Sequence, residues 1–282
     1  MVPAPIKPAV QTVPQETLQK FLDAIDYRIV RSKEEIEKAY GLVYKEYLKR
    51  GYLKENSLRQ KYSLFNALPL TATFIATVEN EILATASVIP DSPLGLPMDE
   101  IYHDELEQFR KENKKVCEVS MLASDTELFK AGISMMLESK KMFFIFSLFK
   151  IILDYVKTVL KLDYICITIN PKHSLTYDFI LFKDFGGLKT YKNANGAPAL
   201  AKYLDLKNVE NECKEKNKEG LYRMFLLKNS APELFADKFG FSREDLKYFF
   251  VDKCDILKTT PPSKLDYIKS CYPDYDFTEI IK

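Results

Sequence analysis

The side chain in this sequence that could carry acid–base chemistry is Glu118, a carboxylate inside an apolar, β-prone segment. Residues 115–125 read Lys-Val-Cys-Glu-Val-Ser-Met-Leu-Ala-Ser-Asp, and Val116, Val119 and Leu122 suit a central strand. A carboxylate in a buried strand is costly unless it is solvated, paired or chemically active. Glu118 is therefore a candidate catalytic residue, and pairing with a buried cation is the alternative.

A second polar group follows the next strand-like segment. Residues 163–170 read Asp-Tyr-Ile-Cys-Ile-Thr-Ile-Asn, and Pro-Lys-His173 comes directly after them. Open α/β sheets present their ligands at the carboxyl ends of such strands. His173 could orient a substrate or act as a second acid or base there. Its alternative role is to cap the helix that we expect to begin at Ser174.

The element that positions both groups is a long apolar helix, expected over residues 141–160. A strand, a crossover helix and a second strand form a right-handed βαβ unit, which makes the two strands parallel. The helix carries one polar stripe, and charges near a bilayer centre are costly, so we predict a core helix and no membrane span. The stripe consists of Lys150, Asp154, Lys157 and Lys161.

Alternating strands and helices precede this unit. A capping box at Ser32 and Glu35 opens a helix that ends near Gly51, and Tyr44 and Tyr47 share one of its faces. Core packing is the ordinary role of such tyrosines, although either could line a substrate pocket. We also expect helices over residues 15–25 and 98–111, strands over 27–31, 71–78 and 82–89, and a three-residue hairpin connection at 79–81.

The second half is expected to end in helices. Strands are predicted over residues 188–192 and 199–206, after a helix from Ser174 to Phe182. We therefore divide the chain into a flexible tail (1–14), an α/β domain (15–206) and a C-terminal helical extension (207–282). Phe235, Phe239 and Phe241 could cover a ligand or simply dock on the sheet. Helices are expected over residues 210–227, 231–239 and 243–254, with a last short one capped by Ser263.

Composition excludes several classes of function. The 282 residues include 41 basic and 40 acidic side chains, so the charge favours neither nucleic acid nor an anionic membrane as a partner. Two histidines and five cysteines without metal-pair spacing predict no metal site. Cys117 and Cys166 lie in expected strands with no base spaced to serve them as nucleophiles. The odd cysteine count and the lack of a signal peptide pattern favour the cytoplasm.

Six short motifs between residues 27 and 206 match a known family in their order. They are Ala39-Tyr40 through Tyr47, Thr73-Phe-Ile-Ala76, Asp91-Ser92 with Gly95-Leu-Pro-Met-Asp99, Glu118-Val-Ser120 with Leu122, Asn170-Pro-Lys-His173 with Tyr177, and Asn195-Gly-Ala-Pro198. Together they resemble the FeeM-type N-acyl amino acid synthases, relatives of the acyl-homoserine-lactone autoinducer synthases within the GNAT superfamily. The resemblance implies an α/β (α+β) GNAT-like fold, with a mixed central sheet, splayed parallel strands and flanking helices.

The same resemblance implies transfer of a long-chain fatty acyl group from acyl carrier protein to the amino group of an amino acid. The acceptor amine must lose a proton before it attacks a thioester, so Glu118 would be the base, directly or through a water. Tyr177 would protonate the departing thiolate, as tyrosines do in many GNAT enzymes. Backbone N–H groups of the splayed strands would stabilise the oxyanion. No tightly bound cofactor is expected, because the acyl donor is linked to phosphopantetheine.

Binding roles follow from the same likeness. Tyr44 and Tyr47 would line the amino-acid site, and Phe146 in the apolar helix could wall an acyl tunnel or fill the core. Contacts to the acyl–pantetheine arm would come from Ser120, Leu122, Ala123, Asn170 and Phe146.

Two departures from the family pattern bear on this function. The GNAT pyrophosphate loop, Gln/Arg-x-x-Gly-x-Gly/Ala, is missing after the central strand, which favours a carrier protein over coenzyme A as donor. Met121 stands where family members tend to have arginine, which could change the amino-acid specificity. The alternatives are an acyl-CoA-dependent N-acyltransferase and a non-catalytic protein that binds fatty acyl groups or a carrier. A basic cluster, which could dock an acidic carrier or be a solvated face, consists of Arg110, Lys111, Lys114 and Lys115.

Overall fold

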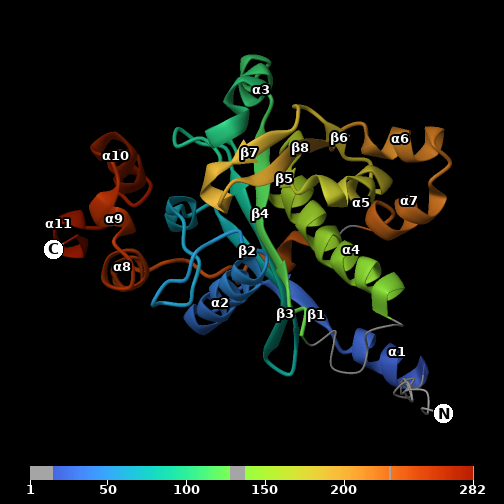
Figure 1. Cartoon of the computed structure of the whole chain (residues 1–282), viewed down its shortest axis with the longest axis horizontal. Coiled ribbons are helices and arrows are strands. Elements are labelled where there is room, and N and C mark those ends of the chain that lie inside the picture. The colour runs from blue at the N-terminus through green and yellow to red at the C-terminus, as the bar shows by residue number, and fades with distance from the viewer. Residues whose placement is uncertain (1–14, 128–136, 229, 282) are drawn as a thin grey trace, which may run out of the picture.

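The structure is a computed structural model that describes residues 15–127, 137–228 and 230–281, so the tail expected over residues 1–14 lies outside the described residues. A mixed sheet forms its centre, in the order β1-β2-β3-β4-β5-β8-β6, and β7 pairs with β8 (Figure 1). Helices cover both faces of this sheet, as the sequence predicts. The strands are β1 (Asp26–Ile29), β2 (Ala72–Val78), β3 (Glu81–Pro90), β4 (Val116–Ser124), β5 (Tyr164–Ile169), β6 (Lys183–Asp184), β7 (Lys189–Tyr191) and β8 (Ala197–Asp205).

The parallel strands β4 and β5 separate partway along their length. They pair at only three positions, and the last pair is Glu118 with Cys166. Beyond it β4 stays with β3 as far as Ser124, while β5 stays with β8 as far as Ile169. The backbone edges that face each other past Glu118 are therefore unpaired. This confirms the predicted parallel unit with splayed strands.

A β-bulge in β4 lies just past the point of separation. Ala86 of β3 faces two residues of β4, Met121 and Leu122, and Met121 has a φ of +55°. The extra residue reverses the alternation of side chains. Leu122 consequently packs in the core on the α4 side, whereas Met121 and Ala123 pack on the α2 side.

One face of the sheet is covered by α4 (Leu137–Tyr155), which continues into a π-helical turn, Val156–Leu160. Its Phe144, Leu148 and Ile152 are buried against the sheet, as predicted for a core helix. None of the helices in the described part of the chain is both long and apolar enough to cross a membrane. The same layer contains α1 (Gln15–Asp23), α5 (Ser174–Phe179), α6 (Val209–Glu215) and α7 (Glu219–Phe225).

The other face is covered by α2 (Lys33–Lys49), α3 (Asp99–Lys111) and the end of the chain. The helices after β8 thus divide between the two faces: Figure 1 shows α6 and α7 beside α5, and the last helices at the opposite side of the molecule. Phe235 packs on Phe74, and Phe241 packs on Phe249 and Phe250, so these phenylalanines dock on the core. The last helices are α8 (Arg243–Lys247), α9 (Ile256–Thr259), α10 (Pro262–Ser270) and α11 (Phe277–Ile280).

Several predicted boundaries were wrong, mostly where the backbone takes a positive φ. The β2–β3 hairpin has a two-residue connection, Glu79 and Asn80, with φ values of +48° and +69°. Such pairs favour tight hairpins because their twist matches that of the strands. Leu181 (φ +71°) and Asn217 (φ +52°) lie just past the ends of α5 and α6, so the expected helices over 174–182 and 210–227 are shorter. Instead of a helix over 231–239 there is a 3-10 turn, Pro232–Phe235, and Ser263 lies inside α10 and does not cap it.

Candidate functional site

Glu118 lies at the last paired position of β4 and β5, with its side chain only 2% exposed. Its Oε2 accepts the backbone N–H of Met98 at 2.8 Å. Burial raises the pKa of this carboxyl to about 8, although the Met98 N–H and the Ser120 side chain act in the opposite direction. No described cation forms an ion pair with it, so pairing does not account for its burial. A carboxyl with this pKa can exchange a proton near neutral pH.

The loop that presents the Met98 N–H is fixed by Arg110 of α3. The Arg110 Nε donates to Asp91 at 2.7 Å, and a terminal guanidinium nitrogen donates to Asp99 at 2.7 Å. These two carboxylates hold both ends of the turn-rich loop after β3. Arg110 is therefore committed to the site's framework, and of the predicted basic cluster only its lysines stay available to a carrier.

Gly95 makes the tightest part of this loop possible. Its φ is +74°, and a Cβ at this position would lie 2.6 Å from the Asp99 Oδ2. That oxygen also accepts the Leu96 N–H at 2.6 Å. The motif Gly95-Leu-Pro-Met-Asp99 thus serves to place a backbone donor on Glu118.

Three tyrosines surround the point where the strands separate. Burial raises the pKa of Tyr47, and the charge of Glu118 and the hydroxyl of Tyr177 raise it further. Burial and Glu118 likewise raise the pKa of Tyr191, whose hydroxyl donates to the Pro97 carbonyl at 2.9 Å. Within the described part of the chain, the hydroxyls of Tyr47 and Tyr177 have no hydrogen-bond partner. Both are therefore free to donate to a substrate.

Thr168 is a candidate that the sequence did not single out. It lies in β5 two residues after Cys166, the partner of Glu118, and so faces the same side of the sheet. Its Oγ1 is buried and has no hydrogen-bond partner among the described residues. An unsatisfied buried hydroxyl costs about 1–3 kcal/mol, which a polar group of a ligand could offset. The period-two spacing from Cys166 was the signal that could have identified it.

Lys61 supplies a half-buried positive charge on the Glu118 side of the sheet. Burial lowers its pKa, whereas the charge of Glu100 raises it. Glu100 also raises the pKa of Tyr191, on which Glu118 acts in the same direction. No described carboxylate forms an ion pair with Lys61. This cation is thus available to an anionic group.

Some predicted site residues have structural roles. The Asn170 Oδ1 accepts the Lys172 N–H at 3.2 Å and caps the turn after β5. The Tyr44 hydroxyl accepts the Asn56 N–H at 3.3 Å and holds the loop after α2. His173 is exposed at the start of α5 and its side chain makes no capping hydrogen bond, so the capping alternative was wrong.

The remaining predicted residues separate by face. Ser120 lies next to Glu118 and acts on its carboxyl. Leu122 and Ala123 point to opposite sides of the sheet, as neighbours in a strand do, and the bulge decides which of them faces α4. Phe146 is buried between helices, 6.0 Å from the Phe179 ring and 5.8 Å from the Phe225 ring, measured between centroids. The structure thus places Glu118, Tyr47, Tyr177 and Ser120 near the separating strands, and leaves Tyr44 and Asn170 in the framework.

Comparison with known proteins gives a consistent result. The family model described as N-acyl amino acid synthase FeeM matches residues 38–205. The solved structure of FeeM, an N-acyl amino acid synthase from uncultured soil microbes, is 32% identical with a TM-score of 0.55, and the match covers 66% of this chain and 93% of that one.

Two further solved structures show similarity in fold alone. The CoA-dependent synthase BjaI, solved with SAM and isopentyl-CoA, is 8% identical with a TM-score of 0.50, covering 76% of this chain and 98% of that one. TofI, in a ternary complex with an inhibitor and MTA, is 10% identical with a TM-score of 0.50, covering 74% and 99%. No curated protein sequence matches the chain.

Proposed function

Because the chain belongs to the FeeM family of N-acyl amino acid synthases and is an N-acyltransferase, we propose that it moves a long-chain fatty acyl group from acyl carrier protein to the amino group of an amino acid. The observation that carries the proposal is the buried, cation-free Glu118 at the point where β4 and β5 separate. A base is needed at this position because an ammonium group cannot attack a thioester.

In the proposed reaction, the Glu118 carboxylate takes a proton from the acceptor amine, directly or through a water. The amine nitrogen then forms a bond to the thioester carbonyl carbon. As the tetrahedral intermediate collapses, the carbon–sulfur bond breaks, and the surplus proton of the bonded nitrogen passes through the Tyr177 hydroxyl to the sulfur, which leaves as a thiol. The unpaired N–H groups along the separated strands are suited to hold the oxyanion.

Tyr177 and Tyr47 are proposed to stabilise the sulfur as it leaves. Burial raises the pKa of both hydroxyls above the ordinary tyrosine value, so both stay protonated at neutral pH. A protonated hydroxyl without another partner can donate a hydrogen bond to sulfur. Ser120 and the unsatisfied Thr168 hydroxyl are proposed to bind polar groups of the pantetheine arm.

Lys61 is proposed to bind the carboxylate of the acceptor amino acid. Met121 occupies the position where the family tends to have arginine, and it is buried with its Sδ accepting from the Asn66 Nδ2 at 3.5 Å. The site therefore needs a cation from another element, and we assign this role to Lys61 because Glu100 acts both on its pKa and on that of Tyr191. His173 remains a proposed second acid or base at the entrance.

A paired product assay tests this function. The parent protein and Glu118→Gln receive palmitoyl-carrier protein or palmitoyl-CoA with the twenty amino acids, and products are identified by mass spectrometry. We expect an N-palmitoyl amino acid from the parent with the carrier donor, reduced about a hundredfold or more in the variant. Product from palmitoyl-CoA alone would favour the acyl-CoA alternative. Absence of product from a folded parent with either donor would reject the transferase and favour a binding protein.

A further inference from the structure

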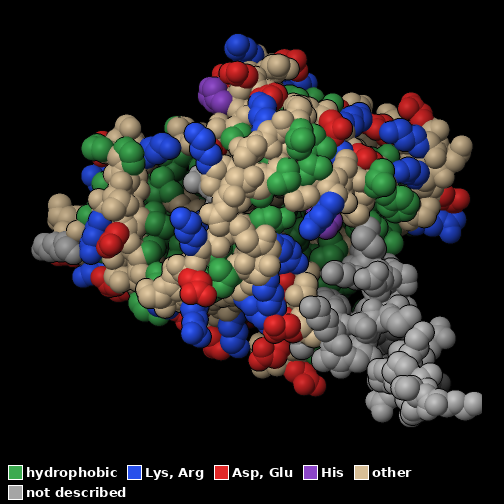
Figure 2. Space-filling view, viewed as in Figure 1, with side chains coloured by type: hydrophobic (Ala, Val, Ile, Leu, Met, Phe, Trp, Pro, Cys, Tyr) green, Lys and Arg blue, Asp and Glu red, His purple; other side chains and the backbone are tan. Residues whose placement is uncertain are grey.

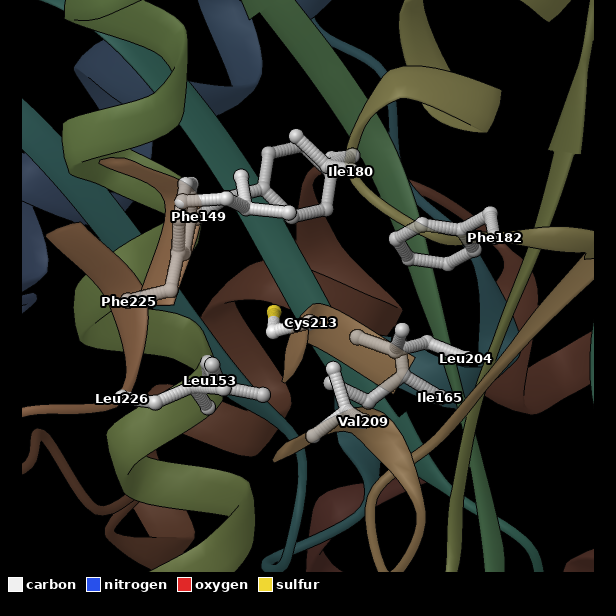
Figure 3. Close-up of a pocket in the computed structure, with 11 residues that line it drawn as sticks. Phe149, Leu153, Ile165, Ile180, Phe182, Leu204, Val209, Cys213, Phe225 and Leu226 are labelled. Carbon is white, nitrogen blue, oxygen red and sulfur yellow. The ribbon is translucent and has the colours of Figure 1, made fainter. Parts of the chain in front are cut away.

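An apolar pocket lies on the α4 side of the sheet, between the core and the first two helices after β8. Figure 3 shows Phe225 and Leu226 on one side of it, Ile165 and Leu204 on the other, and Cys213 between them. The Cys213 sulfur is the one lining side-chain atom drawn that is not carbon. The cavity volume is about 20 Å³, close to the space of one water molecule.

An aromatic cluster lies between the candidate site and the pocket. Tyr177 is within electrostatic reach of Tyr47, which in turn responds to Glu118. The Tyr177 ring lies 5.8 Å from the Phe149 ring and 5.6 Å from the Phe182 ring, and both phenylalanines line the pocket. An apolar chain attached to a thioester carbonyl near Glu118 would therefore meet this pocket next.

The outer wall of the pocket lies beyond the part of the chain that the family model matches. Five lining residues come from α6, α7 and the residue after them, and the family match ends at residue 205, before all five. They are Val209, Cys213, Leu221, Phe225 and Leu226.

Among the described residues, two polar links attach this wall to the core at its rim. Lys183 of β6 pairs with Glu212, and Lys218 donates to the Phe179 carbonyl at 2.6 Å. Both lysines are partly solvent-exposed, and such exposed polar links contribute little to stability. The remaining contacts between this wall and the core are apolar. Because the hydrophobic effect is not directional, these contacts can re-form around an inserted hydrocarbon chain.

We propose that α6 and α7 form a movable end wall of the acyl-chain site, which receives the distal carbons of a fatty acyl group and sets the longest chain accepted. The inference rests on the proposed transfer of acyl groups at Glu118. The pocket is too small for a chain while the wall is packed on α4, so the wall moves outward as the chain enters. Chain length is then limited by how far the wall side chains yield.

Photo-crosslinking of the parent protein tests the location directly. An acyl-pantetheine of sixteen carbons with a diazirine on its last carbon is irradiated with the parent and with Glu118→Gln, and the adducts are mapped by mass spectrometry. We expect adducts in α6 and α7, displaced by excess palmitoyl-pantetheine. Adducts confined to α2 or α8–α11, or no displaceable adduct, would overturn the inference. Adducts in α6 and α7 without any product in the transfer assay would reject the transferase but keep the pocket.

Wall variants test control of chain length. Phe225→Ala, Cys213→Phe and the matched control Phe241→Ala receive a mixture of acyl-carrier donors of eight to eighteen carbons. We expect products longer by about two carbons or more from Phe225→Ala, because a core cavity opens, and shorter products from Cys213→Phe. Phe241→Ala removes the same ring from the opposite face and should keep the parent profile. Folded wall variants with the parent profile would contradict the proposal, and if both fail to fold the crosslinking result decides.

Discussion

Glu118 is buried without a cation, which makes its charged form costly and brings its pKa close to working pH. Among the described residues, one backbone N–H donates to this carboxylate, that of Met98 at 2.8 Å. A core carboxylate that served stability would be paired or hydrogen-bonded more fully. A buried carboxyl whose pKa lies near neutral pH can take up a proton during the reaction and release it afterwards, as a catalytic base must.

The rate of transfer should therefore depend on the ionisation of Glu118. Since burial raises the pKa of this carboxyl to about 8, the active carboxylate is a minor form at pH 6 and dominant above pH 8. We expect kcat/KM to rise about tenfold per pH unit below the inflection and to level off near pH 8. The acceptor amine titrates too, so the Glu118→Gln profile is the control. A parent inflection below pH 6 would contradict this assignment.

Stability should change with pH in the opposite direction. The folded pKa of Glu118 lies above the model-peptide value of 4.5, so the fold binds this proton more tightly than the unfolded chain does. Its stabilising contribution is present below about pH 4.5 and is lost as the pH rises through about 8. Each pKa unit corresponds to about 1.4 kcal/mol, so Glu118→Gln should gain a few kcal/mol over the parent between pH 5 and 9.

Thermal unfolding at pH 5, 7 and 9 measures this difference. The exposed substitution Glu55→Gln is the control and should track the parent at each pH. An equal unfolding temperature for the parent and Glu118→Gln at pH 9 would contradict this prediction, because it would show that ionisation of the Glu118 carboxyl does not lower the free energy of unfolding.

At the scale of elements, the site depends on how the loop between β3 and α3 meets β4. Arg110, Asp91 and Asp99 form a closed set of charge-assisted hydrogen bonds at distances of 2.7–2.8 Å. None of the three side chains hydrogen-bonds Glu118, and the set acts on it through the Met98 N–H and the charge of Asp99. Arg110 is thus a positioning residue.

Arg110→Met should lower kcat with little change in the KM for the donor. Without the guanidinium the loop can drift from Glu118, and misplacement of about 1 Å can cost up to a hundredfold in rate. Loss of the Met98 hydrogen bond also removes an effect that lowers the Glu118 pKa. The pH inflection should therefore move above that of the parent. Lys111→Met, at the neighbouring exposed position, should change neither kcat nor the pH inflection.

The elements differ in how far the sequence could predict them. Apolar periodicity predicted the strand around Glu118, the crossover helix and the parallel pair of strands. The packing of these elements in the structure agrees with that pattern. The bulge at Met121 had no such signal, because a non-glycine residue at a positive φ leaves no mark in the pattern. For the same reason the ends of α5 and α6 were placed too late.

The site was predictable to a similar degree. Glu118 stood out because a carboxylate contradicted its apolar surroundings, and Tyr177 followed from the family likeness. Thr168 did not stand out, because its proximity to Glu118 depends on the register of the strands, which is tertiary. Asn170 and Tyr44 were assigned to substrate, yet the structure shows local hydrogen bonds that occupy their side chains.

At the scale of the whole molecule, the segment after β8 has two separate effects. Its first part closes the apolar pocket against α4, whereas α8–α11 pack on α2 across the sheet.

Phe250, on the second part, is fully buried against Tyr62 and Phe241. Phe250→Ala should cost about 3–5 kcal/mol in unfolding free energy while leaving the chain-length profile unchanged. Denaturant unfolding and the donor-mixture assay measure the two quantities, and a changed profile would show that the two parts are coupled.

Charge over the whole molecule bears on how a carrier would dock. The formal net charge is +1, and Figure 2 shows basic and acidic side chains intermingled over the face in view. No general field therefore draws an acidic carrier to the protein, and attraction must come from a local group of lysines. With Arg110 committed to Asp91 and Asp99, that group reduces to Lys111, Lys114 and Lys115.

Replacing these three lysines with alanine should raise the KM for palmitoyl-carrier protein several-fold at low salt and leave the KM for the acceptor amino acid unchanged. The parent's KM for the carrier should itself rise between about 10 mM and 300 mM salt, because screening lengths fall below the spacing of the charges. The variant should lose most of that salt dependence. Lys264→Ala, which replaces an exposed lysine on α10, is the matched control. An unchanged carrier KM in the triple variant would place the docking surface elsewhere.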